Sequence, residues 1–272
     1  MSYPDIDPII FDFVIFGREL AFTWYGLMYV IGILLGWWLL VRRTRRPDVH
    51  WTPDDIADLA FYVVLGLILG ARLGYILFYD LIPDHGQFSD DPWRVFRVWE
   101  GGMSFHGGLA GVLMAVGLYA WRHRRHFFDI TDFIGPIVPI GLGLGRIGNF
   151  INSELWGKPT DGPFGMVVDG IARHPSQLYQ SLLEGLVMFV VLFWLTTKPR
   201  PRMLVTGLFM IMYGSFRFLV EFVRMPDAHI GYLAWDWLTM GQVLSVPMIL
   251  FGLGLLYLVW RNPVYPPARE QS

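Results

Sequence analysis

The sequence contains no cysteine in 272 residues, and only 16% of its residues are charged. Without cysteine the protein has no disulfide, no thiolate metal ligand and no covalent cysteine intermediate, so any thiol in its chemistry belongs to a substrate. The H-E-x-x-H and acidic calcium-loop motifs are absent as well, and we expect no metal and no other cofactor. The net charge of -2 lacks the basic excess of nucleic-acid-binding proteins, so nucleic acid is not an expected partner.

Apolar residues are abundant where charged ones are scarce. They make up 54% of the chain, which has 12 Trp and 21 Phe, whereas a soluble domain has about 25% charged residues. This composition indicates an integral membrane protein. The first apolar stretch is preceded by Asp5, Asp7 and Asp12 and followed by arginines, the reverse of a secretory signal, so we expect it to remain as a span.

Seven stretches are long and apolar enough to cross a membrane, for which about 20 residues are needed. Backbone polar groups must pair within the bilayer, so we expect helices. The third and fourth stretches contain glycine and polar residues and are expected to be short, broken or partly re-entrant. The prediction is an all-α bundle of seven transmembrane helices in a single domain, residues 1–272. The spans cover roughly residues 19–41, 56–79, 103–121, 130–150, 177–197, 203–223 and 240–260.

Basic residues alternate with these spans. They gather in residues 42–46, 122–126 and 198–202 and in the C-terminal tail. Because basic loops face the cytoplasm, we expect the N-terminus outside and the C-terminus inside. The segments 80–102 and 151–176, rich in turn-forming residues, are then outer loops and are expected to form a small cap.

The run Gly141–Gly157 places one arginine, two asparagines and one glutamate at the end of the fourth span. Arg146 and Asn149 are three residues apart and share a helix face. A guanidinium matches phosphate oxygens and is costly inside a membrane without a task, so this run predicts an anion site that includes Glu154. The alternative is an arginine that reaches lipid headgroups. Gly143–Gly148 also fits G-x-G-x-x-G, but it lies in a membrane helix and we reject a dinucleotide site.

A second polar stripe occurs in the sixth span. Tyr213, Arg217, Glu221 and Arg224 follow at intervals of four, four and three residues, so they line one helix face. We interpret Arg217 as a functional group and Glu221 as a partner of either arginine. The alternative is a structural ion pair that holds helices together.

Several other polar residues lie in or near the spans. His106, at the outer end of span three, is a candidate proton acceptor, with a hydrogen-bonded interfacial histidine as the alternative. Tyr25 is a candidate donor to a lipid headgroup or an interfacial anchor. Arg72 and Glu184 either pair with the other polar groups or line the same cavity. Glycines spaced four residues apart, such as Gly66, Gly70 and Gly74, indicate close helix packing.

The run Gly145–Gly157 closely resembles the signature of the prolipoprotein diacylglyceryl transferase family, with Ser153 where that family usually has glycine. The resemblance implies a seven-span bundle with an outer cap in the bacterial inner membrane, with the active site toward the periplasm. Further matching segments occur in family order and cover nearly the whole chain: Trp24–Tyr29, Phe105–Leu109, His174–Tyr179 and Tyr213–Arg224.

The resemblance also implies an activity. This family transfers the diacylglyceryl group of phosphatidylglycerol to the lipobox cysteine of a preprolipoprotein, forming a thioether and releasing glycerol phosphate, which is the first step of lipoprotein maturation. On that basis we expect Arg146 and Arg217 to clamp the phosphate and His106 to act as the base. The other residues expected to bind substrate are Tyr25, Asn149, Glu154, Tyr213, Glu221 and Arg224.

Two other classes of function stay open at this point. A transporter of an anionic solute would also place Arg and Glu inside the membrane, although the sequence shows no two-fold repeat. A lipid-binding scaffold without catalysis would use the same residues to hold a headgroup. Transfer of lipid to a peptide distinguishes the enzyme from both.

Overall fold

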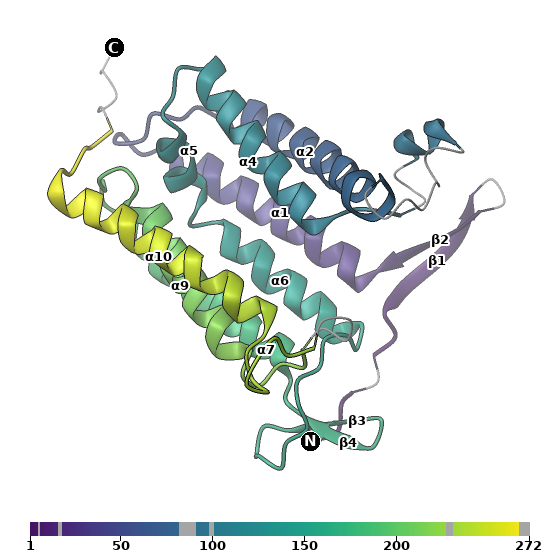
Figure 1. Ribbon diagram of the computed structural model, residues 1–272. Helices are drawn as coiled ribbons and strands as arrows, with labels where there is room; N and C mark the ends of the chain where they lie inside the picture. Colours follow the sequence, from purple (N-terminus) through teal and green to yellow (C-terminus); the bar gives the residue numbers. More distant parts are fainter. Residues whose placement is uncertain (5, 16–17, 82–90, 98–100, 227–230, 267–272) are drawn as a thin grey trace. The chain divides into compact units, whose positions relative to one another are not determined.

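The computed structural model describes residues 1–4, 6–15, 18–81, 91–97, 101–226 and 231–266. The described part is mostly helical and contains two small antiparallel hairpins (Figure 1). It divides into two compact units, Met1–Arg43 with Thr131–Ser272, and Thr44–Ile130. Helices of the first unit are α1 (Trp24–Arg43), α6 (Val138–Ile151), α7 (Ser176–Gln180), the π-helical η4 (Ser181–Val187), α8 (Met188–Leu195), α9 (Leu204–Val220) and α10 (Met240–Arg261). Those of the second are α2 (Pro53–Tyr75), the π-helical η1 (Ile76–Leu81), the 3-10 helix η2 (Pro92–Phe96) and α4 (Phe105–Arg122), while α5 (Phe127–Ile134) crosses the boundary.

A helix lies at each of the seven predicted spans, but not every helix has the properties of a membrane crossing. Among the described residues, α1, α2 with the start of η1, the continuous α7–η4–α8 stretch and α10 are long and apolar enough, and the bent pair α5–α6 makes a fifth if it is counted as one span. Helix α9 has only 17 residues. The structure therefore supports a multi-pass membrane protein, whereas the number of seven crossings stays a prediction.

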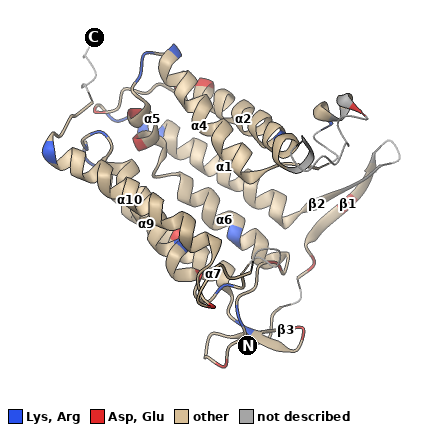
Figure 2. Cartoon of the chain, viewed as in Figure 1, with Lys and Arg blue, Asp and Glu red and all other residues tan. Residues whose placement is uncertain are grey.

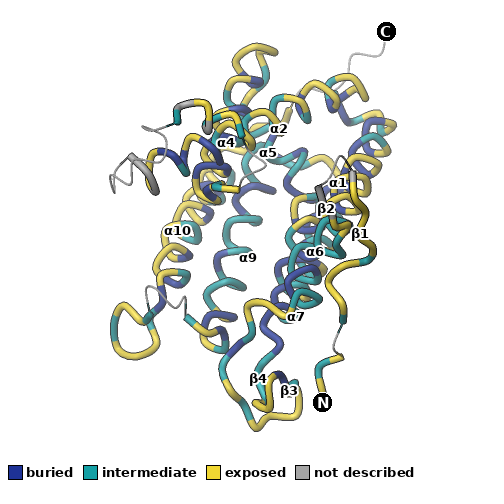
Figure 3. Tube along the Cα trace, turned by 90° about the vertical axis from the view of Figure 1, so that its right-hand side faces the viewer, coloured by how far each residue is buried: buried dark blue, intermediate teal, exposed yellow. Residues whose placement is uncertain are grey.

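The long helices bury little of their surface within the protein. Only 17 to 28% of the residues in the four clearest spans are buried, and Figure 3 shows exposed residues along much of α10. Apolar surfaces of this extent indicate contact with a membrane or a partner. Figure 2 shows that charged residues lie mostly at helix ends and in connecting segments.

The first predicted span, residues 19–41, begins too early. Ile9–Ile15 (β1) and Arg18–Thr23 (β2) form an antiparallel hairpin, and α1 starts only at Trp24. Aromatic and β-branched residues favour strands, and the ring of Phe11 stacks on that of Phe22 with centroids 5.1 Å apart. Hydropathy does not distinguish an apolar strand from an apolar helix, so the predicted helix wrongly included residues 19–23 of β2.

In the second unit, α2 and α4 pack against each other through their glycines. A Cβ atom on Gly66 would lie 2.5 Å from the carbonyl oxygen of Gly111, and one on Gly74 would lie 2.6 Å from Cα of Gly107. Larger side chains do not fit between these backbones. This contact confirms that the glycines spaced four residues apart in α2 serve close helix packing.

Helix α6, which carries Arg146, is held on two sides. The fourth predicted span is broken, as expected, by a 50° bend between α5 and α6. Helix α6 packs against α1 and also against η4, where a Cβ atom on Gly143 would lie 2.9 Å from Cα of Gly185. The hydroxyl of Ser181 donates to the Gly143 carbonyl at 3.0 Å. The rejected G-x-G-x-x-G pattern indeed lies inside this helix, with α5 rather than a strand before it.

Helices α9 and α10 form the other close pair of the first unit. A Cβ atom on Gly252 would lie 2.7 Å from the Gly207 carbonyl oxygen. The residue that precedes α9, Met203, has a φ of 73° and caps nothing with its side chain. Asp132 of α5 supplies the missing cap, because its carboxylate accepts from the Met203 N–H at 2.6 Å and from the Thr206 N–H at 2.7 Å. This contact fixes the start of α9.

The predicted loop 151–176 contains regular structure. Met166–Val168 (β3) pairs with Ile171–Arg173 (β4), and the N-terminal residues lie beside β3. The hydroxyl of Tyr3 donates to the Phe150 carbonyl at 2.9 Å and so ties the N-terminus to the end of α6. The hairpin and the N-terminus thus form one small structure at that end of the helix.

Candidate active site

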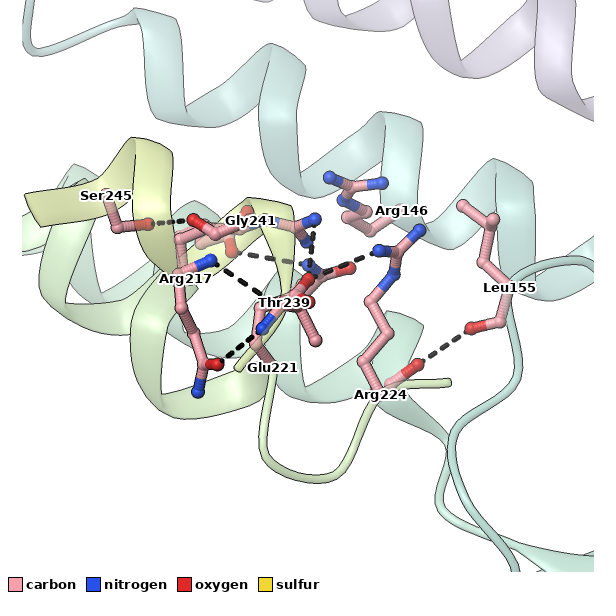
Figure 4. Close-up of polar contacts among 12 residues, drawn as sticks. Arg146, Leu155, Arg217, Glu221, Arg224, Thr239, Gly241 and Ser245 are labelled. Atoms are coloured by element: carbon pink, nitrogen blue, oxygen red, sulfur yellow. Dashed lines mark hydrogen bonds and ion pairs between the residues drawn. The ribbon is translucent and has the colours of Figure 1, made fainter. Parts of the chain in front are cut away.

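The end of α9 forms a compact group of charges around one carboxylate (Figure 4). Glu221 is only 1% exposed. Its Oε1 lies 2.7 Å from Nη2 of Arg217 and 3.2 Å from Nη1 of Arg224. The i, i+4 pair of Arg217 and Glu221 is the one that the sequence predicts, whereas α9 ends at Val220 and Arg224 reaches Glu221 from the segment that follows the helix. Because Glu221 offsets the charge of both arginines, the group can be buried at lower cost.

Two residues at the start of α10 complete this group, and sequence reasoning missed both. The hydroxyl of Thr239 donates to Oε2 of Glu221 at 2.7 Å. A Cβ atom on Gly241 would lie 2.8 Å from the Glu221 carboxyl carbon, so a larger residue there would require the carboxylate to shift. The sequence does contain a pattern that marks Thr239: with Gln242 it forms an S/T-x-x-E/Q capping box at the start of α10.

Arg146 lies beside this group without joining it. Its described side-chain contact is a long one, 3.5 Å from Nη1 to the Asn149 oxygen, and no carboxylate among the described residues lies within ion-pair distance. The strongest electrostatic interactions of Arg146 are with Glu184, Arg217 and Tyr213. Nη1 of Arg217 also has no partner among the described residues. Two guanidinium groups thus have donors without described partners in the same neighbourhood, and Figure 4 shows Arg146 beside the Glu221 group.

The asparagines and the glutamate of the signature run bond to one another. Asn149 donates to Oε2 of Glu154 at 3.3 Å, and Asn152 donates to Oε1 at 2.9 Å. Glu154 is exposed and orients these two amides. Its effect on Arg146 therefore passes through Asn149.

Tyr25, at the start of α1, packs directly on α6. A Cβ atom on Gly148 would lie 2.6 Å from a ring carbon of Tyr25, so glycine is needed for this contact. The Tyr25 hydroxyl shares a 3.0 Å hydrogen bond with that of Tyr29. Arg146 and Glu154 both interact electrostatically with Tyr25. This residue therefore borders the same region as the arginines.

The end of the signature run pairs with the end of α9. Gly157 forms an antiparallel bridge with Arg224, and the Lys158 N–H donates to the Val223 carbonyl at 2.8 Å. A Cβ atom on Gly157 would lie 2.5 Å from that same carbonyl oxygen. Two motifs that are about 70 residues apart in the sequence are thus joined through their backbones.

A row of buried polar side chains follows on α7 and η4. Gln177, Gln180 and Glu184 are all 0% exposed. Gln180 donates to Oε1 of Glu184 at 3.4 Å, and Gln177 donates to the backbone carbonyl of Glu154. Oε2 of Glu184 has no partner among the described residues. Glu184 thus bonds to another polar side chain, Gln180, and lies on a segment that packs against the helix of Arg146.

His106 belongs to the second unit, whereas the arginines belong to the first. It lies in the first turn of α4 and is exposed. Buried Arg72 organises the chain before it by donating to the Gly101 carbonyl at 2.6 Å and the Gly102 carbonyl at 3.0 Å. Arg72 thus supports the backbone that leads to His106. Within the predicted outer loop 80–102, residues 82–90 and 98–100 lie outside the described residues.

The charged groups near Glu221 favour an anion. Three guanidinium groups, Arg146, Arg217 and Arg224, stand against two buried carboxylates, Glu184 and Glu221, which leaves one net positive charge. Arginine donors that are not already bonded are suited to phosphate oxygens. The arrangement can therefore bind a phosphate group and stabilise negative charge that develops on it.

Comparison with known proteins agrees with this chemistry. The family model of prolipoprotein diacylglyceryl transferase matches residues 12–258. The chain is 54% identical over 269 residues to the phosphatidylglycerol–prolipoprotein diacylglyceryl transferase of Ectopseudomonas mendocina, covering 97% of this chain and 98% of that protein. It is 52% identical over 274 residues to the enzyme of the same name from Teredinibacter turnerae, covering 97% and 94%. The chain therefore belongs to the prolipoprotein diacylglyceryl transferase family.

Proposed function

We propose that the protein transfers the diacylglyceryl group of phosphatidylglycerol to the lipobox cysteine of a preprolipoprotein, as the first step of lipoprotein maturation. Family membership over nearly the full chain supports the activity. One observation supports its location: Arg146 and Arg217 keep guanidinium N–H groups without described partners beside the buried Glu221 group. The absence of cysteine agrees with a thiol that comes from the substrate.

The reaction is a displacement at the glycerol carbon that carries the phosphate. The cysteine sulfur, after loss of its proton, forms a bond to this carbon, and the carbon–oxygen bond to phosphate breaks. The electron pair of that bond leaves with glycerol phosphate, and the lipid becomes attached through a thioether. Charge moves from the thiolate to a phosphate monoester, so catalysis requires a deprotonated thiol and a stabilised leaving group.

The residues take complementary roles in this proposal. Arg146 and Arg217 bind the phosphate oxygens, and the second charge on the leaving phosphate strengthens these contacts. Glu221 holds Arg217 and Arg224 in position. Asn149 and Tyr25, which border Arg146, orient the headgroup together with Glu154 and Tyr213.

His106 takes the thiol proton in this proposal. A free thiol has a pKa of about 8.5, so a fraction is already ionised at neutral pH and a nearby positive charge raises that fraction. The proposed base therefore accelerates a step that the arginines already assist. Its removal should leave measurable residual activity.

The membrane arrangement is part of the proposal. The chain crosses the bacterial inner membrane seven times, with the N-terminus and the 151–176 cap on the periplasmic side. Because the natural chain has no cysteine, single cysteines report the side directly. Asp161→Cys should react with an impermeant maleimide added to cells with an opened outer membrane, whereas Arg45→Cys should react only after lysis. The reverse pattern would contradict the orientation.

A transfer assay tests the activity itself. Purified protein in liposomes receives phosphatidylglycerol with labelled acyl chains and a lipobox peptide, and the label on the peptide is measured. A peptide with serine in place of cysteine is the control and should gain none. Label bound to the protein but never transferred would favour a scaffold, and uptake of an anionic solute into the liposomes without transfer would favour a transporter.

A further inference from the structure

Glu184 lies beside the arginines, and the mechanism above gives it no role. Its side chain is completely buried. One oxygen accepts a hydrogen bond from Gln180, and the other has no partner among the described residues. Burying an ionised carboxylate with so few partners is costly.

The segment that carries Glu184 packs against the helix that carries Arg146. The contact between Gly143 and Gly185 brings η4 against α6 one turn before Arg146. Glu184 and Arg217 are both charged neighbours of Arg146. In turn, Arg146 and Arg217 are the two strongest charged neighbours of Glu184. The segment is π-helical, a geometry that is frequent at functional sites.

The two buried glutamates of the site differ in their contacts. Glu221 is fixed by Arg217, Arg224 and Thr239 at 2.7 to 3.2 Å. Glu184 forms no ion pair with any described residue. Glu221 therefore holds arginines in place, whereas no described ion pair ties Glu184 to an arginine side chain.

We propose that Glu184 limits the affinity of the arginines for phosphate, so that the phosphate monoester product can leave. Glu184 is thus a positioning residue, because it acts on the phosphate only through the potential of the arginines. The inference rests on the proposed function. The lipid phosphate carries one negative charge and a monoester carries about 1.5 to 2, so the product responds more strongly than the lipid to any change in this potential.

The size of the effect follows from Coulomb's law. For an assumed separation of about 12 Å and an effective dielectric constant of about 20, one unit charge changes affinity by roughly tenfold. Removing the carboxylate should therefore tighten the lipid by about tenfold and the dianionic product by up to about 100-fold.

Product inhibition tests this directly. Transfer is measured with increasing free glycerol phosphate in the wild type and in Glu184→Gln. Glu184→Met removes the same charge with an apolar side chain of similar length, and it serves in place of Glu184→Gln if that variant does not fold. Both should lower the inhibition constant by at least about tenfold. Two controls keep the charge: Glu184→Asp and Ser181→Ala, which loses only its hydrogen bond to Gly143, should stay within about threefold of wild type.

The inhibition constants of these variants decide whether Glu184 limits phosphate affinity. An inhibition constant that is unchanged or higher in the charge-removing variants overturns the inference, because a purely structural role would weaken phosphate binding. Tightening in Glu184→Asp equal to that in Glu184→Gln also overturns it. If the wild-type protein does not transfer lipid, the proposed function fails instead. Calorimetric binding of glycerol phosphate to wild type and Glu184→Gln then still measures the effect of Glu184.

Discussion

Replacing Thr239 by valine tests whether the site depends on a residue that pairs with no arginine. Valine keeps the shape of threonine but has no hydroxyl. The substitution removes the 2.7 Å hydrogen bond to Glu221 and the 3.3 Å bond in which the hydroxyl accepts from the Gln242 N–H. Thr239 and Glu221 are both buried, so water does not readily replace the missing bonds.

The two lost bonds have separate magnitudes. A hydrogen bond to a charged group contributes about 1.5 to 3 kcal/mol, and a helix N-cap contributes about 1 kcal/mol. Thr239→Val should therefore lower the free energy of unfolding by roughly 2.5 to 4 kcal/mol. The part that fixes Glu221 also holds Arg217 in place. At about 1.4 kcal/mol for each factor of ten, we expect kcat/KM to fall by roughly 10- to 100-fold.

The assay combines thermal unfolding with lipid transfer at a temperature where every variant is folded. Thr239→Ser keeps the hydroxyl and is the matched control, so it should retain both stability and rate. In a Glu221→Gln background the acceptor charge is gone, and Thr239→Val should cost clearly less than in the wild type. That difference isolates the hydrogen bond from other effects of valine.

Two results would refute this reasoning. If Thr239→Val is less stable but transfers lipid at the wild-type rate, the bond stabilises α10 without positioning the arginines. If the effect of valine is equally large in the Glu221→Gln background, the loss does not come from the bond between these two residues.

Three further predictions concern other parts of the chain. Arg146→Lys keeps the charge but loses the planar fork, and it should lower kcat/KM in the transfer assay by about 100-fold or more; a normal rate would remove Arg146 from the phosphate clamp. His106→Gln should lower the rate by about 100-fold or more, and full activity would exclude the base. Asp132→Ala removes the cap of α9 and should lower the free energy of unfolding by about 2 to 3 kcal/mol. Its kcat should not change at temperatures where it is folded, and a slow but fully stable variant would contradict the structural role.

The positions of the helices could be predicted from the sequence because lipid imposes a simple requirement on length and polarity. The break of the fourth span was also predictable, since the segment between α5 and α6 contains Gly135 and Pro136. The β1–β2 hairpin was not, because strand pairing depends on tertiary context and hydropathy treats both structures alike. The start of α1 was misplaced for that reason.

The site was predictable where its members lie close together in the sequence. The contact of Glu221 with Arg217 follows from helix periodicity, whereas Arg224 contacts Glu221 from beyond the end of α9 at Val220. The contacts that join distant segments do not follow from periodicity, and these include the bridge from Gly157 to Arg224 and the bond from Thr239 to Glu221. Each depends on where two elements meet, which local patterns do not encode.

Glu184 and Glu221 show what a motif leaves undecided. In the sequence both are glutamates within apolar spans, and hydropathy assigns them the same cost. Their environments separate them: a carboxylate with three strong partners holds its neighbours in place, whereas one with a single amide donor contributes mainly its charge. The close approach of Gly143 and Gly185 creates the second environment, since larger residues there would push η4 and its carboxylate away from Arg146. Gly143 and Gly185 therefore influence the charge of the site, because their contact keeps Glu184 near Arg146.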